Sequence, residues 1–169
     1  MADLRASLAR QQRVLGLDLG SKTIGLALSD VGLLLASPYP SVPRGKLAAT
    51  AQAIRAIAAR EGVGGLVVGL PLSMDGTRGP AAQAATDWAL ALAEATAVPC
   101  AMWDERLSSA AVNRAMIQEA DLTRKKRAAS VDSAAAAYML QGALDATAPS
   151  RYGGARAASG GIGGMGVGL

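Results

Sequence analysis

Two strand-like runs separated by only three residues constrain most strongly how this chain can fold. The first run covers about residues 13–19 and the second about residues 23–30, with the connection 20–22 between them. Strands joined by so short a link pair antiparallel, because a parallel pair needs a crossover of a dozen or more residues. A turn leads to a third run at about 33–37. The sequence therefore predicts a meander of three antiparallel strands.

Helical and strand patterns alternate after this meander. The expected elements are a helix at about 47–60, a strand at about 66–69, a helix from Pro80 to about 95, a strand at about 98–103, and helices at about 108–119 and 128–146. Strand–helix–strand units of this kind form right-handed crossovers between parallel strands. We therefore expect an α/β fold with a five-stranded mixed sheet, three strands antiparallel and two parallel, flanked by helices.

The chain of 169 residues is long enough for one domain with a proper core. We expect this domain at 13–147, after a loose lead-in or short helix at 1–12 and before a Gly-rich, disordered tail at 148–169. No apolar run reaches the length of about 18 residues that spans a bilayer, and no signal peptide is evident. The one cysteine, Cys100, can form no internal disulfide. These features predict a cytoplasmic protein without a membrane partner.

Three acidic residues stand in surroundings that suit a structural carboxylate poorly. Asp18 interrupts an apolar strand, Glu105 follows the strand at 98–103, and Asp132 opens a nearly uncharged stretch. Buried acids are costly unless a positive group meets them. Because the chain has no His, the natural partner is a hard cation held by oxygen ligands, Mg²⁺ or Mn²⁺. The pattern predicts metal-assisted hydrolysis of a phosphodiester, with the three acids as catalytic and metal-binding residues.

Each acid also has a structural explanation when it is taken alone. Asp18 before a Gly turn is a common turn-capping residue, Glu105 fits a charged loop, and Asp132 near a helix amino end gains from the helix dipole. Residues 18–23 do not form a phosphate-binding P-loop, since Ser stands where that motif has Gly before the Lys, and a strand follows instead of a helix. The metal-site hypothesis therefore depends on the three acids meeting in the fold.

Basic residues outnumber acidic ones by 17 to 13, a net charge of +4, which favours a polyanionic partner. The candidate substrate-binding residues are Lys22, Arg106, Arg124, Lys125, Lys126 and Arg127. The last four form either a phosphate clamp or a solvated helix end. The chain has no Phe and few other aromatic residues, so we expect nucleic acid to be bound through its backbone and shape.

Four segments together resemble the YqgF family of pre-16S ribosomal RNA nucleases, also described as Holliday-junction-resolvase-like. The segments are GLDLGSKTIGLALSD (16–30), VVGLPLSMDG (67–76), DERLSS (104–109) and VDSAAA (131–136). The resemblance implies a ribonuclease H-like fold, a nuclease that matures the 5′ end of pre-16S rRNA, and an acidic triad of Asp18, Glu105 and Asp132. Thr23 and Ser73 depart from the Arg and Asn usual in the family.

Three other functions fit parts of the pattern. A resolvase of branched DNA would share the acids and would call for a two-fold homodimer. A non-catalytic RNA-binding factor of ribosome assembly would use the basic residues alone. An ATPase of the sugar-kinase or actin-like type shares the Asp-x-Gly loop but needs a second lobe, for which we expect no room in this chain.

Overall fold

The elements follow one another in the order expected from the sequence. The computed structural model describes residues 1–71, 77–104 and 124–149, with side chains for all of these except 124–132. The elements are α1 (Ala2–Ser7), β1 (Arg13–Leu19), β2 (Thr23–Ser29), β3 (Ala36–Pro43), α2 (Leu47–Glu61), β4 (Val63–Leu70), α3 (Pro80–Thr96), β5 (Cys100–Asp104) and α5 (Arg124–Thr147). The helix expected at 108–119 lies outside the described residues.

The five strands form one mixed sheet in the order β3-β2-β1-β4-β5. β1 pairs antiparallel with β2, and β2 antiparallel with β3, whereas β4 lies parallel to both β1 and β5. The five-stranded sheet of the ribonuclease H-like prediction is confirmed. Because β1, β3, β4 and β5 run in one direction, they end together, at Leu19, Pro43, Leu70 and Asp104. We call this end of the molecule the carboxyl end of the sheet.

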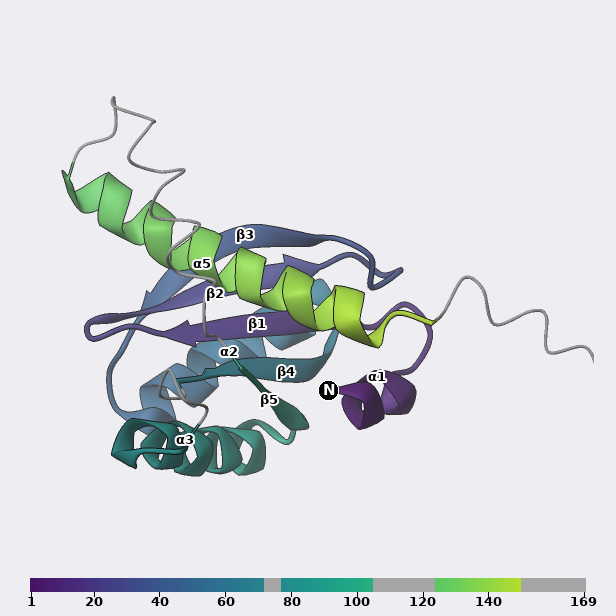
Figure 1. Cartoon of the computed structure of the whole chain (residues 1–169), viewed down its shortest axis with the longest axis horizontal. Helices are drawn as coiled ribbons and strands as arrows, with labels where there is room; N and C mark the ends of the chain where they lie inside the picture. Colours follow the sequence, from purple (N-terminus) through teal and green to yellow (C-terminus); the bar gives the residue numbers. More distant parts are fainter. Residues whose placement is uncertain (72–76, 105–123, 150–169) are drawn as a thin grey trace, which may run out of the picture.

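Helices cover both faces of the sheet (Figure 1). α5 crosses β1, β2 and β3 on one face, and α2 and α3 pack on the other. The buried cluster between the sheet and α2/α3 includes Leu17, Leu26, Ile54, Leu66 and Leu92. The cluster under α5 includes Val14, Val67, Met139, Leu140 and Leu144. Each strand of the centre therefore contributes side chains to two cores, which removes apolar surface from water on both faces.

The third strand lies further along the chain than the sequence predicts, at Ala36–Pro43 instead of 33–37. Residues 30–35 form a turn in which Asp30 Oδ1 accepts hydrogen bonds from the backbone N–H groups of Leu34 (2.8 Å) and Leu35 (3.1 Å). β3 itself carries three prolines, which an edge strand tolerates because its outer N–H groups need no ladder partner. Because of these prolines, the search for apolar runs did not identify residues 38–43 as part of the strand.

β4 begins at Val63, three residues before the predicted strand. The prediction placed the start too late because glycines in a sequence usually indicate the end of a helix or strand. Gly62 is the residue that ends α2, in the left-handed conformation with φ of 67°. A Cβ on Gly65 would lie 2.9 Å from Leu4 Cδ1, so this glycine makes room for the buried Leu4 of α1. α1 is the short helix that was one expectation for residues 1–12, and Arg5 Nη1 ties it to Leu144 O of α5 at 3.1 Å.

α5 begins at Arg124, four residues before the predicted start. The basic run 124–127 therefore forms the first turn of the helix. Position 132 lies two turns inside, too far from the end to gain from the helix dipole, so that structural explanation of Asp132 is wrong. Within the described ranges, no helix is long and apolar enough to cross a membrane.

Candidate active site

Asp18 occupies the central strand and belongs to the face that α5 covers. Side chains alternate between the two faces of a strand. Leu15 and Leu17 pack in the cluster beneath α2 and α3, whereas Val14 packs in the cluster beneath α5. Asp18 continues the second set and is half-buried, one residue before β1 ends. The sequence therefore places a carboxylate on the α5 face, at the carboxyl end of the sheet.

Glycines surround Asp18 on this face. Gly25 of β2 is its direct partner across the antiparallel pair. On the other side, Val68 of β4 is level with Leu17, so Gly69 follows at the level of Asp18. Neither cross-strand neighbour of Asp18 has a side chain, so its carboxylate projects above the sheet surface between them. We call the surface formed by Gly25 and Gly69 the glycine floor. Glycine in a strand interior is typical of sites where a ligand or another backbone approaches closely.

The amino-terminal half of α5 passes over this end of the sheet (Figure 1). Ser133, which follows Asp132, donates a hydrogen bond from Oγ to Tyr39 O of β3 at 2.9 Å. Tyr39 is level with Leu17 of β1, through their common partner on β2. The helix backbone next to Asp132 is thereby fixed at the level of the strand end that carries Asp18. The side chain of Asp132 lies outside the described residues.

Of the acidic pair at 104–105, only Asp104 lies within the described residues. Asp104 is the last residue of the strand, level with Leu70 of β4. Trp103 packs in the cluster under α5 and Met102 in the opposite one, so Asp104 belongs to the α2/α3 face, away from Asp18. Glu105 and Arg106 lie outside the described residues. In the described part of the chain no three acidic, His or Cys side chains group together as a metal site, and two of the three predicted ligands are not in that part.

Helix charges at the carboxyl end of the sheet oppose the usual preference. Acidic residues are favoured in the first turn of a helix and basic ones in the last. α2, α3 and α5 have no acidic residue in their first turns, whereas Glu94 and Asp145 stand in the last turns of α3 and α5, and the last turn of α2 holds both Arg60 and Glu61. α5 even begins with four basic residues. The helix starts therefore add positive potential at the end of the sheet that carries Asp18, which suits a polyanion.

Two basic residues belong to the β1–β2 turn or contact it: Lys22 lies in the turn, and Arg44 donates a hydrogen bond to Gly20 O. Lys22, a substrate-binding residue in the sequence prediction, is exposed in that turn. Arg44 was missed by the sequence interpretation, because it belongs to no motif and precedes α2, far from Asp18 along the chain. Its backbone N–H donates to Lys22 O at 2.9 Å. Of the other predicted substrate residues, 124–127 lie in the first turn of α5 and their side chains are not described.

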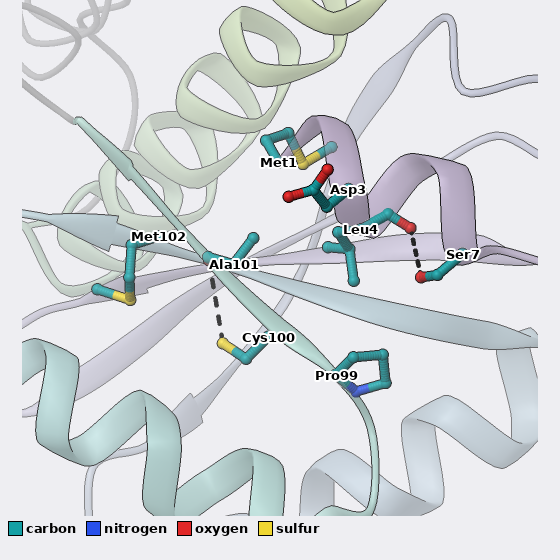
Figure 2. A pocket seen from close by; sticks show the side chains of 8 residues that line it. All are labelled: Met1, Asp3, Leu4, Ser7, Pro99, Cys100, Ala101 and Met102. Atoms are coloured by element: carbon teal, nitrogen blue, oxygen red, sulfur yellow. Dashed lines mark hydrogen bonds between the residues drawn. The ribbon is translucent and has the colours of Figure 1, made fainter.

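A separate hollow of about 450 Å³ lies between α1 and β5 (Figure 2). Its lining residues are Met1, Asp3, Leu4, Ser7, Pro99, Cys100, Ala101 and Met102. Burial raises the pKa of the Cys100 thiol to about 12, so the thiol stays protonated at neutral pH. None of the predicted site residues lines this hollow, and its single carboxylate makes it a poor metal site. The candidate active site is therefore the floor around Asp18.

Comparison with known proteins agrees with the family resemblance. The family model of RuvX, described as Holliday junction resolvase, matches residues 12–146. A protein of Gluconacetobacter diazotrophicus named "Putative pre-16S rRNA nuclease" is 68% identical over 148 residues, which cover 88% of this chain and 96% of that protein. A protein of Acidiphilium cryptum with the same name is 64% identical over 145 residues, or 86% of this chain and 91% of that one.

Among solved structures, "T. thermophilus RuvC in complex with Holliday junction substrate" is a distant likeness. It is 17% identical with a TM-score of 0.48, over 80% of this chain and 95% of that one. The family match extends over the whole sheet and α5. This chain belongs to the RuvX family, and it is a nuclease, a hydrolase of phosphodiester bonds.

Proposed function

We propose that this nuclease cleaves precursor 16S rRNA in the maturation of its 5′ end, with Mg²⁺ or Mn²⁺ held by Asp18, Glu105 and Asp132. The observation that carries the proposal is the position of Asp18, a half-buried carboxylate on a glycine floor at the end of the central strand. The relatives named for pre-16S rRNA support the substrate. The cytoplasm, where precursor rRNA is made, is the proposed location.

The donor chemistry fits a hard divalent cation. The site draws on carboxylate oxygens, and the chain has no His, which favours Mg²⁺ or Mn²⁺ over Zn²⁺. When bound, such a cation supplies activation of water and stabilisation of negative charge on phosphate oxygens. Asp18 contributes an oxygen ligand from the central strand, whose backbone is paired on both sides.

The other two acids follow from the same strand and helix geometry. Asp104, the last residue of β5, belongs to the face away from Asp18, and we propose that Glu105, the next residue in the sequence, faces Asp18. Position 132 precedes the buried Ala135 and Ala136 by three and four residues, on the stripe of α5 that packs on the sheet. We therefore propose that β5 and α5 each bring one carboxylate toward the strand end of Asp18.

Basic residues bind the phosphates on either side of the cleaved bond in this proposal. The proposed contacts are Lys22, Arg106, Arg124, Lys125, Lys126 and Arg127. The run 124–127 lies in the first turn of α5, where positive side chains are unfavourable for the helix itself. A bound phosphate backbone offsets that repulsion. The unfavourable position of these charges is thus explained by a polyanionic substrate.

A second candidate function is the resolution of four-way DNA junctions, which the description of the matching family model favours. The acids and the metal would be the same. The difference lies in assembly, since symmetric cleavage of a junction calls for a homodimer with two active sites. A non-catalytic RNA-binding role is the third candidate, and it would need neither the acids nor the metal.

A cleavage assay with the purified protein tests these functions. The substrates are structured RNA containing the pre-16S 5′ region, single-stranded RNA and a four-way DNA junction. Each substrate is tested with Mg²⁺, with Mn²⁺ and with a chelator. We expect metal-dependent cleavage of the structured RNA. Preferred cleavage of the junction by a dimer would favour the resolvase, and salt-sensitive binding without products would favour the binding factor.

Asp18→Asn is the decisive variant, and Asp87→Asn is its matched control. Asp87 is an exposed carboxylate on α3 that accepts a hydrogen bond from Gln83 Nε2 at 2.9 Å. Groups that only orient metal ligands contribute about 10–100-fold to activity, so loss of a ligand should reduce cleavage at least ~100-fold. The Asp87→Asn variant should cleave like the wild type. Unchanged cleavage by Asp18→Asn would overturn the assignment.

A further inference from the structure

Arg44 holds the turn that follows the strand of Asp18. Its Nη1 donates a hydrogen bond to Gly20 O at 2.7 Å, and its backbone N–H donates to Lys22 O at 2.9 Å. Within the turn, Gly20 N–H donates to Thr23 O at 2.9 Å. A Cβ on Gly20 would lie 2.7 Å from that carbonyl oxygen, so the turn is too tight for any other residue. Arg44 thus fixes, from the β3–α2 connection, a turn that begins two residues after Asp18.

This contact gathers positive charge beside the candidate active site. Lys22, Arg44 and Lys46 are all exposed. The sequence has no Asp or Glu between residues 31 and 60. The ion pairs found among the described residues, Arg13–Glu61 and Arg60–Glu61, lie at the opposite end of α2. The basic side chains of the turn and of the β3–α2 connection are therefore not neutralised by acidic neighbours in the described structure.

The guanidinium of Arg44 has further N–H groups that can donate hydrogen bonds besides the one that contacts the turn. A guanidinium offers five N–H donors in a planar fork that matches a phosphate group. In the described structure one of these groups is occupied, by Gly20 O. That hydrogen bond also fixes the orientation of the fork, so less side-chain freedom is lost when an anion binds.

We propose that Arg44, together with Lys22 and Lys46, binds a backbone phosphate of the nucleic acid next to the bond that is cleaved. The proposal rests on the proposed function of the Asp18 site and adds to it a positioning surface formed by the β1–β2 turn and the β3–α2 connection. The recognised group is the phosphodiester backbone, which RNA and DNA share. Arg44 is thus a substrate-positioning residue, and it adds no group to the chemical step.

Arg55 provides a matched control. It is also an exposed arginine that holds a backbone carbonyl, with Nε and Nη2 donating to Ala95 O at 3.0 and 2.6 Å. Its contact joins α2 to the end of α3, which is remote from the carboxyl end of the sheet because α3 begins there. Arg55→Ala therefore removes the same charge and the same type of hydrogen bond at a site without a role in the proposal.

The test measures the affinity of an RNA hairpin and of a four-way DNA junction over a series of salt concentrations. All variants carry Asp18→Asn so that the probes stay intact, and thermal unfolding verifies that each variant is folded. For Arg44→Ala we expect affinity to fall about 3–30-fold and the slope of log K against log salt to decrease by about one, on both probes. Arg44→Lys should keep the slope with an intermediate affinity, since it keeps the charge and loses the fork. Arg55→Ala should match the parent.

An unchanged affinity and slope for Arg44→Ala would overturn the proposal and leave Arg44 as a structural residue of the turn. An effect on one probe alone would also overturn it, because the phosphate is common to both. Failure of the proposed function would give a different result. Either Asp18→Asn would not reduce cleavage, or the Asp18→Asn protein without further substitutions would bind neither probe.

Discussion

The hydroxyl of Ser133 donates a hydrogen bond to the backbone carbonyl of Tyr39 at 2.9 Å and thereby joins α5 to the edge strand β3. Ser133 is buried, with 9% of its surface exposed, and it follows Asp132 directly. The position of Asp132 over the sheet thus depends on a polar contact between residues 94 positions apart.

Ser133→Ala should weaken this attachment of α5. We expect the free energy of unfolding to fall by about 0.5–1.5 kcal/mol, because a partly buried hydrogen bond is lost. Cleavage should fall more than stability predicts, since position 132 loses its neighbouring anchor. Urea unfolding and cleavage rates under native conditions measure the two effects. Wild-type cleavage by a folded Ser133→Ala protein would show that the hydrogen bond has no influence on the site.

Gly16→Ala should push α5 slightly away from the sheet at Leu140. A Cβ on Gly16 would lie 3.0 Å from Leu140 Cβ, closer than the helix can accept without moving. We expect a loss of about 1–3 kcal/mol in the free energy of unfolding, as for other overpacked cores. Gly45→Ala is the control, since a Cβ there meets nothing within 4 Å, and its effect should stay within about 0.5 kcal/mol.

The double variant Gly16→Ala with Leu140→Ala tests whether this contact is the cause. Its destabilisation should be smaller than the sum of the two single losses, because Leu140→Ala removes Cδ2 and Cγ, which would lie 3.3 and 3.5 Å from the new Cβ, and leaves the Cβ contact at 3.0 Å. Strict additivity in urea unfolding would mean that the contacts of Leu140 Cδ2 and Cγ are not the cause of the loss.

Asp30 should make stability depend on pH in the acidic range. The backbone N–H groups of Leu35 and Leu34 hold the pKa of its carboxyl below the ordinary value of 3.8. A lowered pKa in the folded state stabilises the protein above the ordinary value, and this contribution is lost as pH falls through the folded-state pKa. The difference in unfolding free energy between wild type and Asp30→Asn should therefore shrink below pH ~4. Urea unfolding at several pH values measures it, and a difference that is constant down to pH ~2.5 would contradict the assignment.

Cys100 should react slowly with thiol reagents in the folded protein. Its burial raises the thiol pKa to about 12, and only the thiolate is nucleophilic. Because it is the one cysteine of the chain, Ellman's reagent reports on this residue alone. At pH 8 we expect labelling at least ~10-fold slower in buffer than in 8 M urea. Equal rates would show that the hollow beside α1 exposes a reactive thiol.

Much of the fold could be predicted because short stretches of sequence determine the hairpin and the helices. The short connection 20–22 dictates the β1–β2 hairpin, and helical periodicity located α2 and α3 within a residue or two. The strand β3 could not be located this way, since its prolines oppose the usual strand pattern and are tolerated only because β3 lies at an edge. Edge and centre are properties of the assembled sheet, which one segment of sequence does not contain.

The sequence by itself determined the family of this protein and the groups available to the proposed metal site: carboxylates at Asp18, Glu105 and Asp132, no His, and an excess of basic residues. Only the tertiary structure decided the surroundings of Asp18. Gly25 and Gly69 come to lie on its two sides through an antiparallel and a parallel pairing, and Arg44 reaches its turn from another connection. The physical reason is that strand register and hydrogen bonds between distant residues form only on folding, whereas the identity of a side chain is present before it.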